Sequence, residues 1–257
     1  MVGMAGKLLF LGTGASMGTP VITCACEVCK SADPKNQRLR PSALVSVGGK
    51  RFLIDAGPDF RTQALRAHIM DLDGVILTHT HHDHTAGLDD LRVFDFYHHK
   101  KLPCLLSKNS LEEIRQSYPF FFKPGKHRFE FEVFAEDFGE VFFGGLEWKY
   151  GSYVQNGMKV TGYRLGSMAY VLDIKEYTDE IFLFLKGVKT LILSALRERP
   201  SPAHLTIEDA IIFARKVGAE KTYFSHISHE VDHTTVSKKL SPDIELAYDG
   251  LEVTFDN

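Results

Sequence analysis

The sequence is poor in cysteine and tryptophan and contains no long hydrophobic segment. Only four of its 257 residues are cysteine and one is tryptophan, whereas 44% are apolar. A chain of this length can bury a substantial core without disulfides. No apolar run approaches the roughly 20 residues of a membrane span, so we expect no membrane partner. Residues 1–7 lack the charged and apolar regions of a secretory signal, which favours a cytoplasmic location.

The sequence also lacks a strong net charge. Its 30 lysines and arginines oppose 33 aspartates and glutamates, which gives a formal charge of −3. This balance gives no overall electrostatic reason to expect nucleic-acid binding, although it leaves a local basic cleft open. The sequence shows no low-complexity tract, short-period repeat or linker. We therefore expect a single domain over residues 1–257.

Strand-like and helix-like segments alternate along the chain, which by itself predicts a mixed α/β fold. Hydrophobic patterning predicts strands over residues 7–11, 43–47, 51–55, 74–77, 129–134, 141–148, 160–165, 169–173, 190–193, 221–224 and 244–247. Helices are predicted over residues 59–67, 178–185 and 206–217. Thr206 opens the last of these helices as an N-cap, and two acidic residues follow in its first turn.

The densest group of potential metal ligands follows a short apolar run. Residues 78–84 read THTHHDH and place four ligand side chains within six residues. Alternate side chains of an extended segment point the same way, so His79 and His81 can address one metal. The tighter turn through Asp83 and His84 can address a second. Imidazole with carboxylate is a Zn²⁺ ligand set, with Mn²⁺ or Fe²⁺ as alternatives. The competing interpretation is a solvated cluster of surface histidines.

Three of the four cysteines form a second group. Cys24, Cys26 and Cys29 have the spacing Cys-x-Cys-x-x-Cys within an irregular segment. In a cytosolic chain this spacing indicates metal binding before disulfide formation. Three thiolates leave a tetrahedral zinc one ligand short. The alternative is a set of reduced cysteines without metal. Cys104 lies in an apolar stretch and is predicted to be a buried core residue.

Residues 79–84 have the pattern His-x-His-x-Asp-His after a strand, which resembles the signature of the metallo-β-lactamase-fold hydrolases. Further landmarks of that superfamily match at residues 11–16, 53–57, 172–173, 225–229 and 248–250. Within it, the sequence is similar to the phosphodiesterase of the carbon-phosphorus lyase pathway, which hydrolyses a ribosyl cyclic phosphate and carries an additional Cys-rich zinc site. The resemblance implies a four-layer αββα sandwich.

The resemblance also implies three zinc ions, two in the active site and one structural. The active-site ligands that it implies are His79 and His81 for site one, Asp83, His84 and His226 for site two, and Asp173 as a bridge. Two such ions share a water that becomes hydroxide near neutral pH and can attack phosphorus. His229 would complete the structural site of the three cysteines.

Three further residues receive roles from the same resemblance. Asp55 would orient a metal ligand, and its alternative is an ordinary carboxylate at a strand end. His204 would lie near the substrate phosphate, where it protonates the leaving alkoxide or donates a hydrogen bond. Its alternative is a surface position ahead of a helix. Arg197 would bind a phosphate through two hydrogen bonds or lie at the surface.

One position departs from the subgroup, whose members carry a histidine as the third ligand of site one. By counting, Asn156 takes that place, and no histidine occurs between His127 and His204. An amide oxygen is a weaker ligand that suits harder cations. Site one is therefore expected to be weakened, emptied or filled by another metal. The substitution is natural or introduced, and the sequence does not distinguish the two.

These features predict a metal-dependent phosphodiesterase acting on a small phosphate ester, cyclic or linear. One alternative is a related hydrolase, such as a thioesterase, a lactonase or a tRNA-processing nuclease, although no long RNA-gripping insertion is present. Another is a noncatalytic protein that binds phosphate or nucleotide, an alternative kept open by Asn156. The aromatic stretch 118–124 has no regular period. If exposed, it would suggest a homodimer contact or a substrate-facing lid. Burial under a sheet is the alternative.

Overall fold

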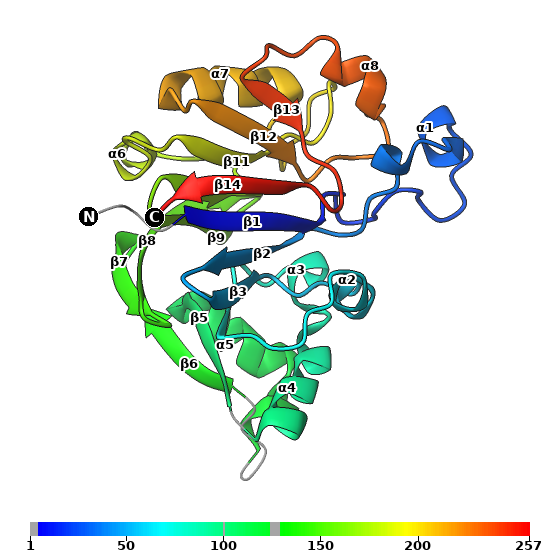
Figure 1. Ribbon diagram of the computed structural model, residues 1–257. Coiled ribbons are helices and arrows are strands. Elements are labelled where there is room, and N and C mark those ends of the chain that lie inside the picture. The colour runs from blue at the N-terminus through cyan, green and yellow to red at the C-terminus, as the bar shows by residue number, and fades with distance from the viewer. Residues whose placement is uncertain (1–4, 100, 124–128) are drawn as a thin grey trace.

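Two β-sheets lie face to face at the centre of the molecule, and helices cover their outer faces (Figure 1). The computed structural model describes residues 5–99, 101–123 and 129–257. Within these ranges each sheet has seven strands. The expected αββα sandwich is confirmed.

The first sheet combines an antiparallel half with a parallel half. Its strands, in spatial order, are β14 (Glu252–Asp256), β1 (Ala5–Gly12), β2 (Ser42–Val47), β3 (Lys50–Ile54), β4 (Gly74–Ile76), β5 (Leu102–Ser107) and β6 (Phe129–Phe134). The strands from β14 to β3 pair antiparallel, and those from β3 to β6 pair parallel. A hairpin turn at Gly48 and Gly49 joins β2 to β3, and both residues have positive φ angles that favour glycine.

The second sheet has the same division. Its strands, in spatial order, are β13 (Ile244–Leu246), β12 (Lys221–Ser225), β11 (Thr190–Ser194), β10 (Met168–Val171), β9 (Met158–Leu165), β8 (Leu146–Gln155) and β7 (Phe138–Phe143). The strands from β13 to β10 pair parallel, and those from β10 to β7 pair antiparallel. Polar loops that follow parallel strands therefore gather at one edge of each sheet.

The helices that accompany the two sheets are α1 (Glu27–Lys30), α2 (Phe60–Arg66), α3 (His82–Thr85), α4 (Arg92–His98), α5 (Lys108–Ser117), α6 (Glu180–Phe184), α7 (Ile207–Val217) and α8 (His233–Ser237).

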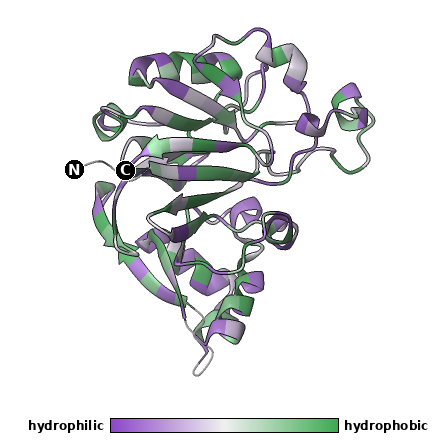
Figure 2. Ribbon diagram, viewed as in Figure 1, coloured by the Kyte–Doolittle hydropathy of each residue, from purple (hydrophilic) through white to green (hydrophobic). Residues whose placement is uncertain are grey.

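Three layers of apolar side chains hold the sandwich together. Between the sheets, Phe52 and Trp148 pack edge to face with ring centroids 5.5 Å apart. Two outer layers lie under the helices, and Phe213 of α7 is buried in one of them. Figure 2 shows hydrophobic residues along the strands and on the helices.

Several local predictions are confirmed and others are wrong. The helix expected at residues 59–67 is α2, and Thr206 caps α7 through a capping box with Asp209. The single strand expected over residues 141–148 is instead two strands, β7 and β8. A turn at Gly144 and Gly145, both with positive φ, separates them. The apolar residues on both sides of this turn hid it from the hydrophobic pattern.

Within the aromatic stretch at residues 118–124, Pro119–Phe122 form a short 3₁₀ helix, η3. Phe121 is buried and stacks on Tyr118 with ring centroids 5.2 Å apart, whereas Phe120 is partly exposed. Pro124 lies outside the described residues. The segment therefore anchors itself to the first sheet through part of its aromatic surface. Among the described residues, no helix combines the length and hydrophobicity needed to span a bilayer.

Candidate metal centre

The histidines and aspartates singled out in the sequence meet at the ends of parallel strands from both sheets. Asp55 follows β3, and the histidine loop follows β4 in the first sheet. Asp173 follows β10, and His226 follows β12 in the second. Asp55, Asp173 and His226 have φ angles of 60°, 59° and 57°. Such left-handed conformations are costly for residues other than glycine and concentrate at functional sites.

Four side chains form the tightest group. His84 Nε2 lies 3.1 Å from Asp173 Oδ2 and 3.5 Å from Asp83 Oδ2, and His226 Nε2 lies 3.2 Å from Asp173 Oδ1 and 3.5 Å from Asp83 Oδ2. Metal–ligand bonds of 2.0–2.2 Å place neighbouring N and O ligands about 2.9 Å apart in an octahedron and about 3.4 Å apart in a tetrahedron. Each of these four pairs is therefore spaced as two ligands of a shared cation would be, with Asp83 and Asp173 in different groups of potential ligands.

The hydrogen bonding of this group also fits a cation. Asp55 Oδ2 lies 2.7 Å from His84 Nδ1, which places a proton on Nδ1 and directs Nε2 toward Asp83 and Asp173. Among the described residues, His84 Nε2 and Asp173 Oδ2 are buried and without a hydrogen-bond partner, although they lie 3.1 Å apart. Buried polar atoms are normally satisfied. A bound divalent cation would satisfy both.

The electrostatics of the protein alone point the same way. Burial lowers the pKa of His84, but the carboxylates of Asp83, Asp55 and Asp173 outweigh it and raise that pKa well above its usual value. Burial raises the pKa of Asp173, but His226 and His84 hold it far below the usual range. Three buried carboxylates thus draw positive charge toward one point. Divalent cations provide such charge without protonating a ligand.

Asp55 and Thr78 hold the histidine loop, residues 78–84, in place through hydrogen bonds. The Asp55 carboxylate accepts hydrogen bonds from the Thr78 amide at 2.8 Å and from the Thr78 hydroxyl at 2.7 Å, in addition to its contact with His84. Asp55 is fully buried. This is the position from which a carboxylate orients a metal-binding imidazole.

His79 and His81 do not occupy equivalent positions in the structure, although the sequence analysis assigned both to one metal. His79, His84 and Asp173 form one potential cation group. His81 contacts His79, with 2.9 Å between Nδ1 and Nε2, but it lies outside the groups of three or more potential ligands found among the described residues. Burial, followed by the nearby His84, lowers the pKa of His79 well below its usual value, so its imidazole is neutral and available as a ligand.

One buried tyrosine joins the two halves of the centre and a second buried tyrosine supports the half in the second sheet, and the sequence analysis missed both. Tyr163 of β9 donates a hydrogen bond of 2.8 Å to the carbonyl of Leu77, one residue before the histidine loop. The Thr161 amide bonds the Thr78 carbonyl at 2.9 Å. Tyr153 donates to the carbonyl of Leu172, one residue before Asp173, at 2.6 Å. The first two bonds cross from one sheet to the other and fix the separation of their ligands.

The structure corrects the position assigned to Asn156. Asn156 and Gly157 are the exposed corner of the β8–β9 hairpin, with φ angles of 47° and 82°. Two consecutive positive φ angles with the sequence Asn-Gly indicate a type I′ turn. The residue that enters the centre is Gln155, which is 2% exposed and lies 2.9 Å from Asp173 through Nε2. The sequence Asn156-Gly157 is itself a signal for a tight turn, and it places the residue that faces the centre one position earlier, at Gln155.

His204 adjoins the centre on its more open side. Its Nδ1 lies 3.2 Å from Asp173 Oδ1, and its ring stacks on His226 with centroids 4.7 Å apart. Burial and the neighbouring His226 lower the pKa of His204 to about 4, so the ring is neutral near pH 7. Arg197 instead pairs with Glu230, with 2.6 Å between Nη1 and Oε1. A phosphate would have to compete with that carboxylate for Arg197.

The cysteine segment forms a separate group with His229. The His229 Nδ1 atom lies 3.4 Å from Cys24 Sγ, 3.4 Å from Cys26 Sγ and 3.6 Å from Cys29 Sγ. Zinc bonds of 2.0–2.1 Å to nitrogen and 2.3 Å to sulfur place tetrahedral N and S ligands about 3.5 Å apart. A hydrogen bond from the Cys29 amide, and then one from His229, lower the pKa of Cys26 to about 6, which favours its thiolate. The four residues fit a structural zinc.

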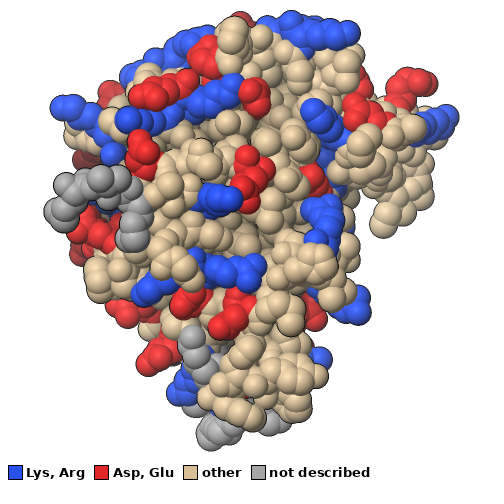
Figure 3. Space-filling view, in the orientation of Figure 1, with Lys and Arg blue, Asp and Glu red and all other residues tan. Residues whose placement is uncertain are grey.

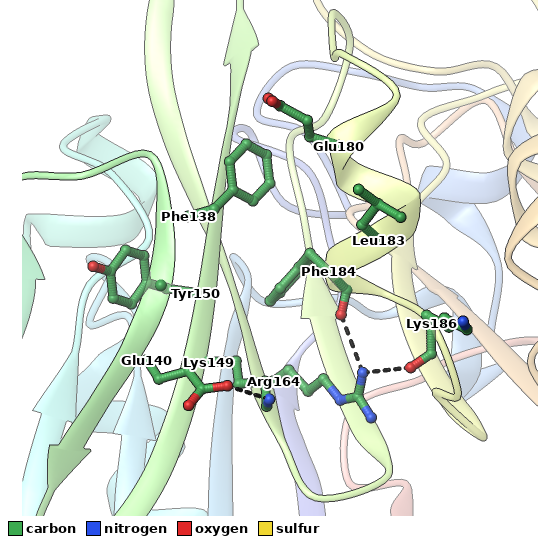
Figure 4. Close-up of a pocket in the computed structure, with 10 residues that line it drawn as sticks. Phe138, Glu140, Lys149, Tyr150, Arg164, Glu180, Leu183, Phe184 and Lys186 are labelled. Carbon is green, nitrogen blue, oxygen red and sulfur yellow. Dashed lines mark hydrogen bonds and ion pairs between the residues drawn. The ribbon is translucent and has the colours of Figure 1, made fainter.

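A pocket of about 600 Å³ lies away from both groups, between β7, β8, β9 and α6 (Figure 4). Three of its charged side chains are already paired within the protein. Arg164 donates to the carbonyls of Phe184 and Lys186 at the end of α6, and Lys149 pairs with Glu140.

Figure 3 shows acidic and basic residues interspersed over one face of the molecule. The His/Asp group is therefore the stronger candidate for a functional site.

Comparison with known proteins supports this assignment. Residues 50–227 match the model of the beta-lactamase superfamily domain. The crystal structure of a diphosphatase from the PhnP family is 37% identical and covers 98% of both chains, with a TM-score of 0.92. The Zn²⁺-bound PqqB structure from Methylobacterium extorquens is 19% identical, covers 96% of this chain and 99% of that one, and has a TM-score of 0.77. At that identity the second likeness concerns the fold alone.

A curated relative differs in length from this chain. An octanoyltransferase from Porphyromonas gingivalis is 36% identical over 261 residues, which cover 97% of this chain but 52% of that protein. The chain thus spans about half the length of this relative.

Proposed function

The chain belongs to the beta-lactamase superfamily, and from this premise together with the His/Asp group we propose that it hydrolyses a P–O bond of a small phosphate diester or diphosphate with divalent metal ions. The observation that carries the proposal is the spacing of 3.1–3.5 Å among buried ligand atoms of His84, Asp173, Asp83 and His226. The similarity to a PhnP-family diphosphatase supports a phosphate substrate.

Each residue of the group has a defined task in this proposal. Asp83, His84, Asp173 and His226, with His79, would hold the cations. Bound divalent cations supply a Lewis acid for the phosphoryl oxygens and lower the pKa of water. Asp55 keeps the His84 proton on Nδ1, so that Nε2 presents its lone pair. The Tyr163 bond to Leu77 keeps the ligand loops of the two sheets at a fixed separation, and the Tyr153 bond to Leu172 supports the loop that carries Asp173.

His204 is the residue that we assign to the substrate. Its side chain is 15% exposed, compared with 1% for Asp173, so it faces the side from which a ligand can enter. A neutral imidazole can donate one hydrogen bond and accept another. We propose that His204 orients a phosphate oxygen through a hydrogen bond. When the negative charge of the bound substrate lies beside its ring, His204 would also share a proton with the leaving oxygen.

The Cys/His group serves stability in this proposal. Cys24, Cys26, Cys29 and His229 would bind one structural zinc, which would tie the loop before β2 to the loop after β12. Because His229 follows His226 by three residues, this zinc would also restrain a strand end that bears an active-site ligand.

A second candidate is hydrolysis of an acyl ester or thioester, since a relative with which the chain aligns over nearly its whole length is named octanoyltransferase. Phosphate and acyl substrates can be compared directly with the same enzyme and metal. Purified protein, freed of metal and reloaded with Mn²⁺ or Zn²⁺, would be tested on bis(p-nitrophenyl) phosphate, p-nitrophenyl phosphate and p-nitrophenyl octanoate.

We expect metal-dependent turnover of the phosphodiester, little turnover of the monoester and none of the octanoate. Turnover of the octanoate alone would establish the second candidate and reject the first. Phosphate binding without turnover of any of the three compounds would indicate a binding protein.

A further inference from the structure

Gln155 is the buried amide in a centre made otherwise of histidines and carboxylates. It ends β8, immediately before the Asn-Gly turn. Its Nε2 lies 2.9 Å from Asp173 Oδ1 and 3.2 Å from His204 Nδ1. Its Oε1 is buried and has no hydrogen-bond partner among the described residues. A buried carbonyl without a partner costs free energy, so a further group is expected to interact with this amide.

The two ends of a glutamine amide have nearly the same shape, and rotation about the last side-chain bond exchanges them. Without a cation, the NH₂ group faces Asp173 because the carboxylate attracts a donor. With a cation at Asp173, the oxygen is the better end to face it. The spacing of 2.9 Å between the amide and Asp173 Oδ1 is the distance of about 2.9 Å expected between neighbouring ligands of an octahedral cation.

We propose that Gln155 is a metal-selectivity residue, whose amide turns to place Oε1 beside Asp173 on a bound cation. Asp173 belongs to two of the potential cation groups of the active site, so a ligand beside it adjoins the cation that it holds. A neutral amide oxygen suits a hard cation such as Mn²⁺ or Mg²⁺, whereas imidazole suits Zn²⁺. The wild-type centre should therefore hold one cation that prefers oxygen ligands. The inference rests on the proposed metal-dependent function and specifies its metal.

The test is a measurement of metal preference that does not depend on turnover. Metal-free wild-type protein, Gln155→His, Gln155→Glu and Asn156→His would be titrated with Mn²⁺ and Zn²⁺ by calorimetry, and bound metal would be counted after competition between the two. Asn156→His is the matched control, because it adds the same imidazole at the neighbouring exposed position.

We expect Gln155→His to shift the ratio of Mn²⁺ to Zn²⁺ affinity toward Zn²⁺ by more than about tenfold, since it changes a direct ligand. Gln155→Glu keeps the shape and an oxygen ligand, so it should bind Mn²⁺ more tightly than the wild type. Asn156→His should leave the ratio unchanged. An unchanged ratio in Gln155→His, or an equal shift in Asn156→His, would overturn the inference.

Melting curves without metal would show whether each variant folds. If Gln155→His does not fold, Gln155→Glu decides the matter, because loss of Mn²⁺ binding in that near-isosteric variant contradicts an oxygen ligand at this position. The proposed function fails in a different way. A wild-type protein that binds both metals with the expected preference but hydrolyses no phosphate ester would reject the reaction and leave the role of Gln155 standing.

Discussion

The two ligand groups of this protein are assembled in opposite ways. The cysteine group takes three of its four side chains from residues 24–29 and lies in a partly exposed loop region. The His/Asp group takes its side chains from the ends of strands in both sheets, and most of them are fully buried. A local segment thus sets the first geometry, whereas the packing of two sheets sets the second. Substitutions in the cysteine segment should therefore disturb only the cysteine group. Substitutions in the core between the sheets should disturb the His/Asp group.

The largest expected effect is the loss of hydrolysis in His84→Ala. The substitution removes a buried ligand and takes one partner from each of the carboxylates of Asp55 and Asp173. Turnover of bis(p-nitrophenyl) phosphate should fall by more than about a thousandfold, as for the loss of an essential active-site group. His82→Ala is the matched control, because His82 belongs to the same loop but is exposed. Equal losses in both variants would show that the loop, rather than the ligand, matters.

Cys26→Ser should separate the two groups. Bound zinc measured by mass spectrometry should fall by one ion per chain, and the melting temperature should decrease by roughly 2–4 °C for each kcal/mol of lost stability. The active-site ligands stay intact, so activity below the melting temperature should persist. Cys104→Ala, which changes a buried cysteine outside the group, should keep its zinc. If Cys26→Ser retained full zinc content, the structural site would be wrongly assigned.

Tyr163→Phe tests whether the core controls the His/Asp group. The change removes only the hydroxyl that bonds the Leu77 carbonyl and leaves that carbonyl buried. Its cost should be about 1–3 kcal/mol in the free energy of unfolding. Because the bond joins the two sheets, active-site metal affinity should fall while the zinc of the cysteine group is unchanged. Tyr170→Phe serves as a control in the same core layer. Equal metal affinity in wild type and Tyr163→Phe would mean that the ligand loops hold their own geometry.

The smallest expected effect concerns pH and the surroundings of the cysteine loop. Burial and the adjacent cations of Arg38 and Lys35 lower the pKa of His233 to about 4, and Arg38 Nη2 lies 3.1 Å from its Nδ1. The unfolded chain, with a histidine pKa near 6.5, therefore binds the proton first as pH falls. The stability that the neutral ring contributes is fully present above about pH 6.5 and is lost as pH falls toward 4.

His233→Gln replaces this ring with a side chain that does not titrate. Denaturant unfolding between pH 4 and pH 7 should show a shallower loss of stability in the variant than in the wild type. Identical pH profiles would exclude His233 as a contributor.

Much of the centre could be predicted because its ligands lie next to recognisable strands. Residues 78–84 and the cysteine spacing carry their chemistry in a few consecutive positions, and the landmarks around Asp55, Asp173 and His226 follow apolar runs. The structure brings the histidine loop, Asp55, Asp173 and His226 together, and it places the three cysteines in a separate group with His229. Asn156 was assigned by counting residues along a hairpin. An error of one residue in such a count selects a side chain on the wrong face, because adjacent residues of a strand point to opposite faces.

The sequence by itself determined a mixed α/β fold and the residue types that can bind metal, because these depend on hydrophobic period and on ligand spacing within short segments. Its resemblance to the metallo-β-lactamase-fold hydrolases added the superfamily and the αββα sandwich. Only the tertiary structure decided that Gln155 enters the centre, that Arg197 pairs with Glu230, and that Tyr163 ties the histidine loop to the opposite sheet. Each of these contacts joins segments that are more than 15 residues apart. Their partners are therefore set by how the two sheets pack, which no local pattern specifies.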